Sequence, residues 1–262
     1  KVDTTAPLGL TGDWLLDPDT IDIATGSALG IPANGTIALD DHPGEEVTIT
    51  PGSIITALAT TDVTLEAALA INVNADVSYT SGHAFSLLSQ GAINVNANVQ
   101  NAGTGNITLV AGWDGTTLSP TAFTTFGSGA FGNGGAVTEI GGSNAAAGVA
   151  VGSAGGTTII ATSNLYLNAL NGVAQVGYQG PGGGNINILA DQNLSLSSGQ
   201  GGYLAQIGNG SANSTVGGDV TGDIFIKAGL DTEIDSRNSN NVYLGNYSVG
   251  NSETGDVTLI TQ

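Results

Sequence analysis

Internal repetition is the feature that most restricts how this chain can fold. The segments Ile71–Val77 and Ile93–Val99 differ at one of seven positions and begin 22 residues apart. A second pair, Thr158–Leu167 and Asn187–Leu196, is similar over its whole length. A unit of this size is too small to bury its own apolar face and has to stack on its neighbours. The repetition therefore predicts a solenoid.

Apolar residues and asparagines alternate within the 22-residue repeat. Because successive side chains of a strand point to opposite sides, the alternation indicates strands with one side in a core. A 22-residue period is then one turn of a parallel β-helix with short corners. We expect Ile71 to stack over Ile93 inside. We expect Asn72 and Asn94 to hydrogen-bond to each other outside, as stacked identical amides do.

Two further motifs recur later in the chain. A strand-closing tag that ends in Gly is found at 139–141, 175–177, 206–208 and 243–245. An opening strand preceded by Gly is found at 185–188, 223–226 and 256–259. Between them lie Gly-rich segments such as 180–184, which predict loops at the corners, since tight reversals need positive φ.

The chain is predicted to be one all-β domain, residues 1–262, a parallel β-helix with loop excursions at its corners. Residues 1–55 are less regular and residues 56–262 contain clear coils, interrupted by a loop excursion near 113–136. Helix signals are confined to Thr56–Ala70 and Asn144–Ala150, and β-branched residues or Gly break both.

Charge and composition exclude several partners. The chain has 42 Gly, three Lys plus Arg, no Cys and a formal net charge of −19. Nucleic-acid binding needs a basic surface, and anionic lipid headgroups are disfavoured for the same reason. No apolar run reaches the roughly 18 residues of a membrane span. We expect neither nucleic-acid binding nor membrane insertion. The start, Lys1-Val-Asp3, predicts an internal or processed piece of a longer chain.

Three motifs carry a resemblance to a known family: Asp13–Pro18, Leu109–Gly115, and the Ala-Gln-Val/Ile-Gly tags at 174–177 and 205–208. The chain resembles the passenger region of filamentous haemagglutinin-like exoproteins, which are large Gram-negative proteins of the two-partner secretion route. The resemblance implies a right-handed parallel β-helix, secreted or displayed on the bacterial cell surface. It also implies export through an outer-membrane secretion barrel and a non-catalytic role as a stalk or adhesin segment, in cell adhesion or biofilm formation.

The alternative from another class is a polysaccharide-active β-helix enzyme, a lyase or a hydrolase. A hydrolase would need carboxylates that converge on one groove, and the candidates are Asp219, Asp223, Asp231, Glu233 and Asp235. A lyase would need a base, for which Lys227 and Arg237 are the internal candidates. Exposed strand faces in so acidic a chain produce the same pattern, and we predict no catalytic residues.

Binding of a glycan or surface receptor would use exposed aromatic rings. The candidate ligand-binding residues are Trp113, Asp114, Tyr178, Tyr203 and Tyr243. The tyrosines lie at or beside the closing tag, so stacked coils would bring several of them to one edge. The same positions are also explained by rings that seal the core at a corner, and the two interpretations stay open.

No metal or cofactor is expected. His42 and His83 have no zinc-ligand spacing. The acidic stretch 40–46 is predicted to be a solvated turn between two strands. The alternative is a cation site, because hard cations take clustered carboxylates. A third alternative for function is end-to-end self-association into filaments, because residues 259–262 show no polar cap and a solenoid end has open strand edges.

Overall fold

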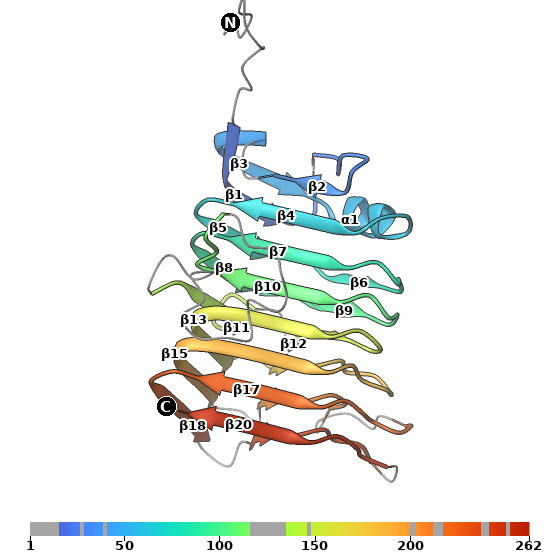
Figure 1. Cartoon of the computed structure of the whole chain (residues 1–262), viewed down its shortest axis with the longest axis vertical. Helices are drawn as coiled ribbons and strands as arrows, with labels where there is room; N and C mark the ends of the chain where they lie inside the picture. Colours follow the sequence, from blue (N-terminus) through green and yellow to red (C-terminus); the bar gives the residue numbers. More distant parts are fainter. Residues whose placement is uncertain are drawn as a thin grey trace, which may run out of the picture.

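The computed structural model describes residues 16–26, 29–38, 41–115, 135–145, 148–199, 203–211, 217–236, 241–249 and 252–261. These residues form an all-β protein of parallel strands with one short helix (Figure 1). The strands form a 14-stranded and a 6-stranded sheet, both curled. Every strand pair in the described ranges is parallel. The predicted all-β parallel class is confirmed.

The strands stack in three columns, which we number in the order in which a turn passes through them. Column one consists of β2 (Thr36–Ile37), β4 (Val63–Ala67), β7 (Phe85–Ser89), β10 (Ile107–Ala111), β13 (Thr158–Ala169), β15 (Ile186–Ser198), β17 (Ile224–Ala228) and β20 (Val257–Thr261). The period of the short repeat is seen directly in this column, since Val63 pairs with Phe85 and Phe85 with Ile107.

Column two belongs to the same sheet, because β13 and β15 are long enough to run through both columns. It consists of β3 (Asp41–Ile49), β1 (Leu16–Ile23), β5 (Ala70–Val73), β8 (Ala92–Val95), β11 (Val137–Gly141), the second halves of β13 and β15, and β18 (Asp231–Ser236). Strand β1 lies between β3 and β5, so the order of strands in space departs from the order in the chain at this end.

Column three is the 6-stranded sheet. It consists of β6 (Val77–Tyr79), β9 (Val99–Asn101), β12 (Gly148–Ser153), β14 (Val173–Val176), β16 (Leu204–Ile207) and β19 (Asn241–Leu244). Helix α1 (Pro51–Leu58) packs against β6 and buries Ile54 and Leu58 at the N-terminal end of this column.

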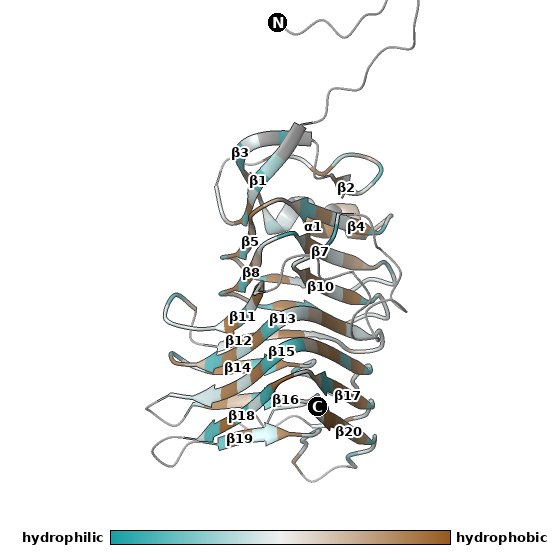
Figure 2. Cartoon of the chain, turned by 60° about the vertical axis from the view of Figure 1, so that its left-hand side comes forward, coloured by the Kyte–Doolittle hydropathy of each residue, from teal (hydrophilic) through white to brown (hydrophobic). Residues whose placement is uncertain are grey.

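The inward side chains form one continuous core. Ile71 pairs with Ile93, as predicted, and both are fully buried. The same core cluster extends from Ile21 to Ala228. Figure 2 shows apolar segments recurring from strand to strand down the stack. Burial of this apolar surface is the main contribution to stability.

The long repeat is not in one register. The sequence match aligns Thr158 with Asn187, but in the structure Thr158 pairs with Ile186, one residue earlier. Asn164 pairs with Asn193, as the match predicts. The two halves of β13 therefore pair with β15 at different offsets. The change occurs at a bulge after Thr162, where one strand has an extra residue.

The closing tag was predicted at four places, and three of them stack. Gln175 pairs with Gln206, and Gln206 pairs with Tyr243. The fourth, at 139–141, also ends a strand, but in column two, where Glu139 pairs with Asn94 and Tyr166.

Two predictions near the N-terminus also differ from the structure. Residues 41–45 of the predicted acidic turn belong to β3, because they pair with β1 through irregular registers; residues 39 and 40 lie outside the described ranges. Helix α1 was not predicted. Its start carries a local signal, since the Thr50 hydroxyl oxygen accepts a hydrogen bond from the Ser53 N–H (3.3 Å) and Pro51 opens the first turn.

The segment for which the excursion was predicted, near 113–136, separates a strand of column one from the next strand of column two. The chain leaves column one after Ala111 and re-enters column two at Val137, where Thr138 pairs with Ile93 of the preceding turn. Residues 116–134 lie outside the described ranges.

Candidate functional site

The candidate residue Trp113 lies in an apolar cluster on the outer side of column one. Its side chain is 3% exposed and packs with Leu88, Val110, Ile159, Ala161 and Leu189. A buried indole cannot stack on a sugar ring, so the structure gives Trp113 a packing role. Asp114 follows it and is half-buried.

Sequence reasoning missed this outer cluster, although a signal is present. Leu87-Leu88, Leu109-Val110 and Ile188-Leu189 are consecutive apolar pairs that break the strict alternation of a half-buried strand. The second residue of each pair points outward, so its apolar side chain has to be buried by another side chain on the outer side.

The candidate tyrosines do not share one row. Tyr243 pairs with Gln206, whereas the Tyr178 N–H donates to the side-chain oxygen of Asn209 (2.9 Å) and so lies at a different position of the turn. Tyr203 is half-buried against the main core. The structure instead brings Tyr243 next to Tyr247, with ring centroids 5.7 Å apart and the planes at 66°.

The five candidate carboxylates lie in two places, three on one strand and two in the segment before β17. Asp231, Glu233 and Asp235 lie along β18 in column two. Asp219 accepts a hydrogen bond from the Ser252 N–H (3.1 Å), and Asp223 accepts one from the Asp256 N–H (3.0 Å). Lys227 lies on β17 between Leu189 and Ile260; Arg237 is outside the described ranges. Within those ranges, no three His, Asp or Glu side chains form a group that could hold a metal ion.

The two histidines pair with single carboxylates. His83 Nδ1 lies 3.3 Å from Asp62 Oδ1, and His42 Nδ1 lies 3.6 Å from Glu45 Oε2. Nearby, Glu46 shares a hydrogen bond with Asp22. This bond, together with the repulsion between the two carboxylates and a small loss of solvation, raises the pKa of Glu46 above its ordinary value.

A ladder of side-chain oxygens precedes the strands of column one. In each case Oδ1 accepts a hydrogen bond from a backbone N–H one turn further along: Asp62 from Ala84 (2.8 Å), Asn106 from Thr157 (2.8 Å), Asn185 from Asp223 (2.9 Å) and Asp223 from Asp256 (3.0 Å). Gly105, Gly184 and Gly222, which precede three of these four positions, allow the close stacking. A Cβ on Gly184, for example, would overlap the carbonyl oxygen of Gly156.

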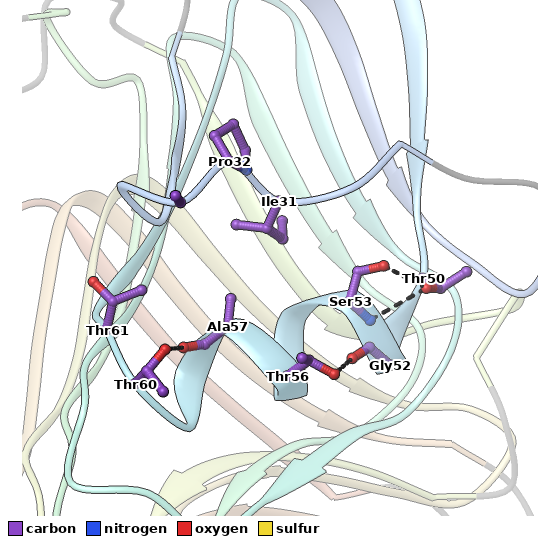
Figure 3. Close-up of a pocket in the computed structure, with 10 residues that line it drawn as sticks. Ile31, Pro32, Thr50, Gly52, Ser53, Thr56, Ala57, Thr60 and Thr61 are labelled. Atoms are coloured by element: carbon purple, nitrogen blue, oxygen red, sulfur yellow. Dashed lines mark hydrogen bonds between the residues drawn. The ribbon is translucent and has the colours of Figure 1, made fainter.

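One cleft, of about 650 Å³, lies between α1 and the loop that contains Ile31 and Pro32 (Figure 3). Two of its hydroxyl groups donate to carbonyl groups of α1: Thr56 Oγ1 to Gly52 (2.7 Å) and Thr60 Oγ1 to Ala57 (3.4 Å). Ile31 packs against the core below the loop. The helix and the loop thus cover the N-terminal end of the core.

A second cleft, of about 460 Å³, lies on the outer surface of column one. Its lining consists of Asn185, Asn187, Asp223, Ile224, Phe225, Asp256 and Thr258. A smaller cleft of about 390 Å³ shares Asn185 and Asp223 and continues over the Gly-rich corner. The larger one combines an aromatic ring with amide, hydroxyl and carboxylate groups, which is the chemistry of a small polar ligand site. Sequence reasoning did not single out Phe225, because its neighbours come from the strands of the preceding and following turns, which are distant in the sequence.

No helix in the described ranges has the length and apolarity to cross a bilayer. Comparisons with protein-family models, with curated proteins and with solved structures found no match.

Proposed function

We propose that this chain is a right-handed parallel β-helix that serves as a non-catalytic stalk or adhesin segment of a secreted bacterial surface protein. The observation that carries the proposal is the register. From Val63 to Thr261 successive turns place their strands in the same columns, pair by pair and always in parallel. A stack of this kind is an extended scaffold whose loops and outer faces are available for contact.

The sequence motifs shared with filamentous haemagglutinin-like passengers support the same proposal. A Cys-free chain rich in Gly and short polar residues suits export in an unfolded state through an outer-membrane barrel. The core and the ladders form only when successive turns are stacked, so folding is coupled to the arrival of each new turn. We expect a dedicated secretion barrel as the partner during export.

Adhesion is tested with beads coated with the whole chain, which are applied to cultured epithelial cells and to polystyrene. Beads coated with serum albumin are the control. Adhesion above the control on either surface supports the proposal. The release of reducing sugar or unsaturated uronate from a panel of polysaccharides, lost in Asp223→Asn, would overturn the non-catalytic role.

A further inference from the structure

The outer surface around Phe225 has a regular layout that follows from the strand registers. Asn187, Phe225 and Thr258 form one row across β15, β17 and β20. The residues two positions earlier, Asn185, Asp223 and Asp256, form a second row on the same side. Neighbours within a row are about 4.8 Å apart, and the rows are about 7 Å apart. Together the rows cover an area close to that of one pyranose ring.

The two rows differ in how their polar groups are engaged. In the second row, Asn185 and Asp223 use one oxygen each for the backbone ladder, which holds these side chains in place. Asn187, Asp256 and Thr258 make no side-chain hydrogen bond within the described ranges, and all three line the 460 Å³ cleft. The half-buried Phe225 ring lies between Asn187 and Thr258. The cleft therefore offers an aromatic ring bordered by free hydrogen-bonding groups.

We infer that this cleft binds one neutral hexopyranose residue of a glycan. The C–H face of a pyranose stacks on an aromatic ring, and the surrounding amide, hydroxyl and carboxylate groups suit its hydroxyls. Asp223 and Asp256, in a chain of net charge −19, disfavour sialic and uronic acids. Lys227 lies two residues after Phe225, on the same side of β17. Its single positive charge does not outweigh the negative charges of Asp223 and Asp256. The inference rests on the proposed adhesin function and names its ligand class.

Saturation-transfer NMR on the whole chain tests the site, with the methyl glycosides of glucose, galactose, mannose and N-acetylglucosamine as probes. We expect transfer to the ring protons of at least one glycoside and none to methyl sialoside. Phe225→Ala should weaken binding at least tenfold. Tyr166→Ala is the matched control, since Tyr166 is a half-buried aromatic residue on β13 in column two; it should leave binding unchanged.

Two further variants separate recognition from folding. Phe225→Leu keeps apolar bulk but removes the ring, so it should lose binding even if Phe225→Ala fails to fold. Asp256→Ala removes a carboxylate that no other described residue uses, and we expect severalfold weaker binding with an unchanged circular dichroism spectrum. The absence of transfer to every neutral glycoside, or equal transfer in wild type and Phe225→Leu, would overturn the inference.

The bead assay distinguishes this inference from the proposed function. Wild-type beads that adhere, with no glycoside bound, would overturn the sugar site and leave the adhesin proposal standing. Beads that fail to adhere, with glycoside binding that depends on Phe225, would overturn the adhesin proposal and leave the sugar site standing.

Discussion

The side-chain amide of Asn94 donates a hydrogen bond to the side-chain oxygen of Asn72 at 2.8 Å, from one turn of column two to the next. Asn72 in turn donates to the Asp22 carboxylate at 2.7 Å. An amide carries both a donor and an acceptor, so the same residue can be repeated in every turn and bond on both sides. The ladder thus adds directional bonds to a core that is held by non-directional burial.

Replacing Asn72 by Ala should destabilise the chain by about 2 kcal/mol, because two half-buried hydrogen bonds are lost and one of them is to a carboxylate. Urea unfolding followed by circular dichroism measures the change. Ser78→Ala, at an exposed position on β6, is the matched control and should change the free energy of unfolding by less than about 0.5 kcal/mol. Equal effects of the two substitutions would show that the ladder contributes nothing.

The sequence predicts the register well where near-identical segments repeat. The pairing of Ile71 with Ile93 and the Asn72–Asn94 bond both follow from two heptapeptides that differ at one position. The offset change in β13 could not be predicted in this way. It depends on one extra residue at a bulge, and the polar residues Asp191 and Gln192 fit either register.

The surface was harder to predict than the core. The tyrosines were expected to share an edge because each lies near the closing tag, yet a shift of two or three residues along a turn places a side chain elsewhere. Phe225 gained its neighbours Asn187 and Thr258 only through the pairing of three strands. Such a grouping depends on the register of every turn, whereas a core position depends only on alternation.

Gly208 and Gly245 provide a matched pair for testing the close stacking at the corner of column three. Both have positive φ, +151° and +144°, which an L residue rarely adopts. A Cβ on Gly208 would overlap the carbonyl oxygen of Gly245, while a Cβ on Gly245 meets no atom within 4 Å. Gly208→Ala should therefore cost about 2 kcal/mol more than Gly245→Ala, measured by urea unfolding. Equal costs would show that backbone conformation alone requires Gly here.

The Glu46–Asp22 pair predicts a pH dependence. The shared hydrogen bond and the repulsion between the two groups raise the pKa of Glu46 in the folded state. Its contribution to stability is thus fully present below the unfolded pKa of about 4.3 and is lost as pH rises through the raised folded pKa.

Glu46→Gln removes this loss, because the amide donates to Asp22 at every pH. The variant should be more stable than wild type at about pH 7 and similar to it at about pH 3, by urea unfolding at both pH values. Glu233→Gln, on the exposed β18, is the control for the removal of one negative charge. The same gain from both substitutions would assign the effect to net charge.

Trp113 allows packing to be separated from ligand binding at a residue that the sequence suggested for recognition. Its ring is 3% exposed and covers Leu88 and Val110 on the outer side of column one. Trp113→Ala should destabilise the chain by about 3 to 5 kcal/mol, and Trp113→Phe by less, because part of the apolar contact remains.

In a Trp14→Phe background the emission reports on Trp113 alone. We expect blue-shifted emission that acrylamide quenches poorly and that methyl glycosides leave unchanged. Emission at the wavelength of exposed tryptophan, shifted by a glycoside, would show instead that the ring is a binding platform.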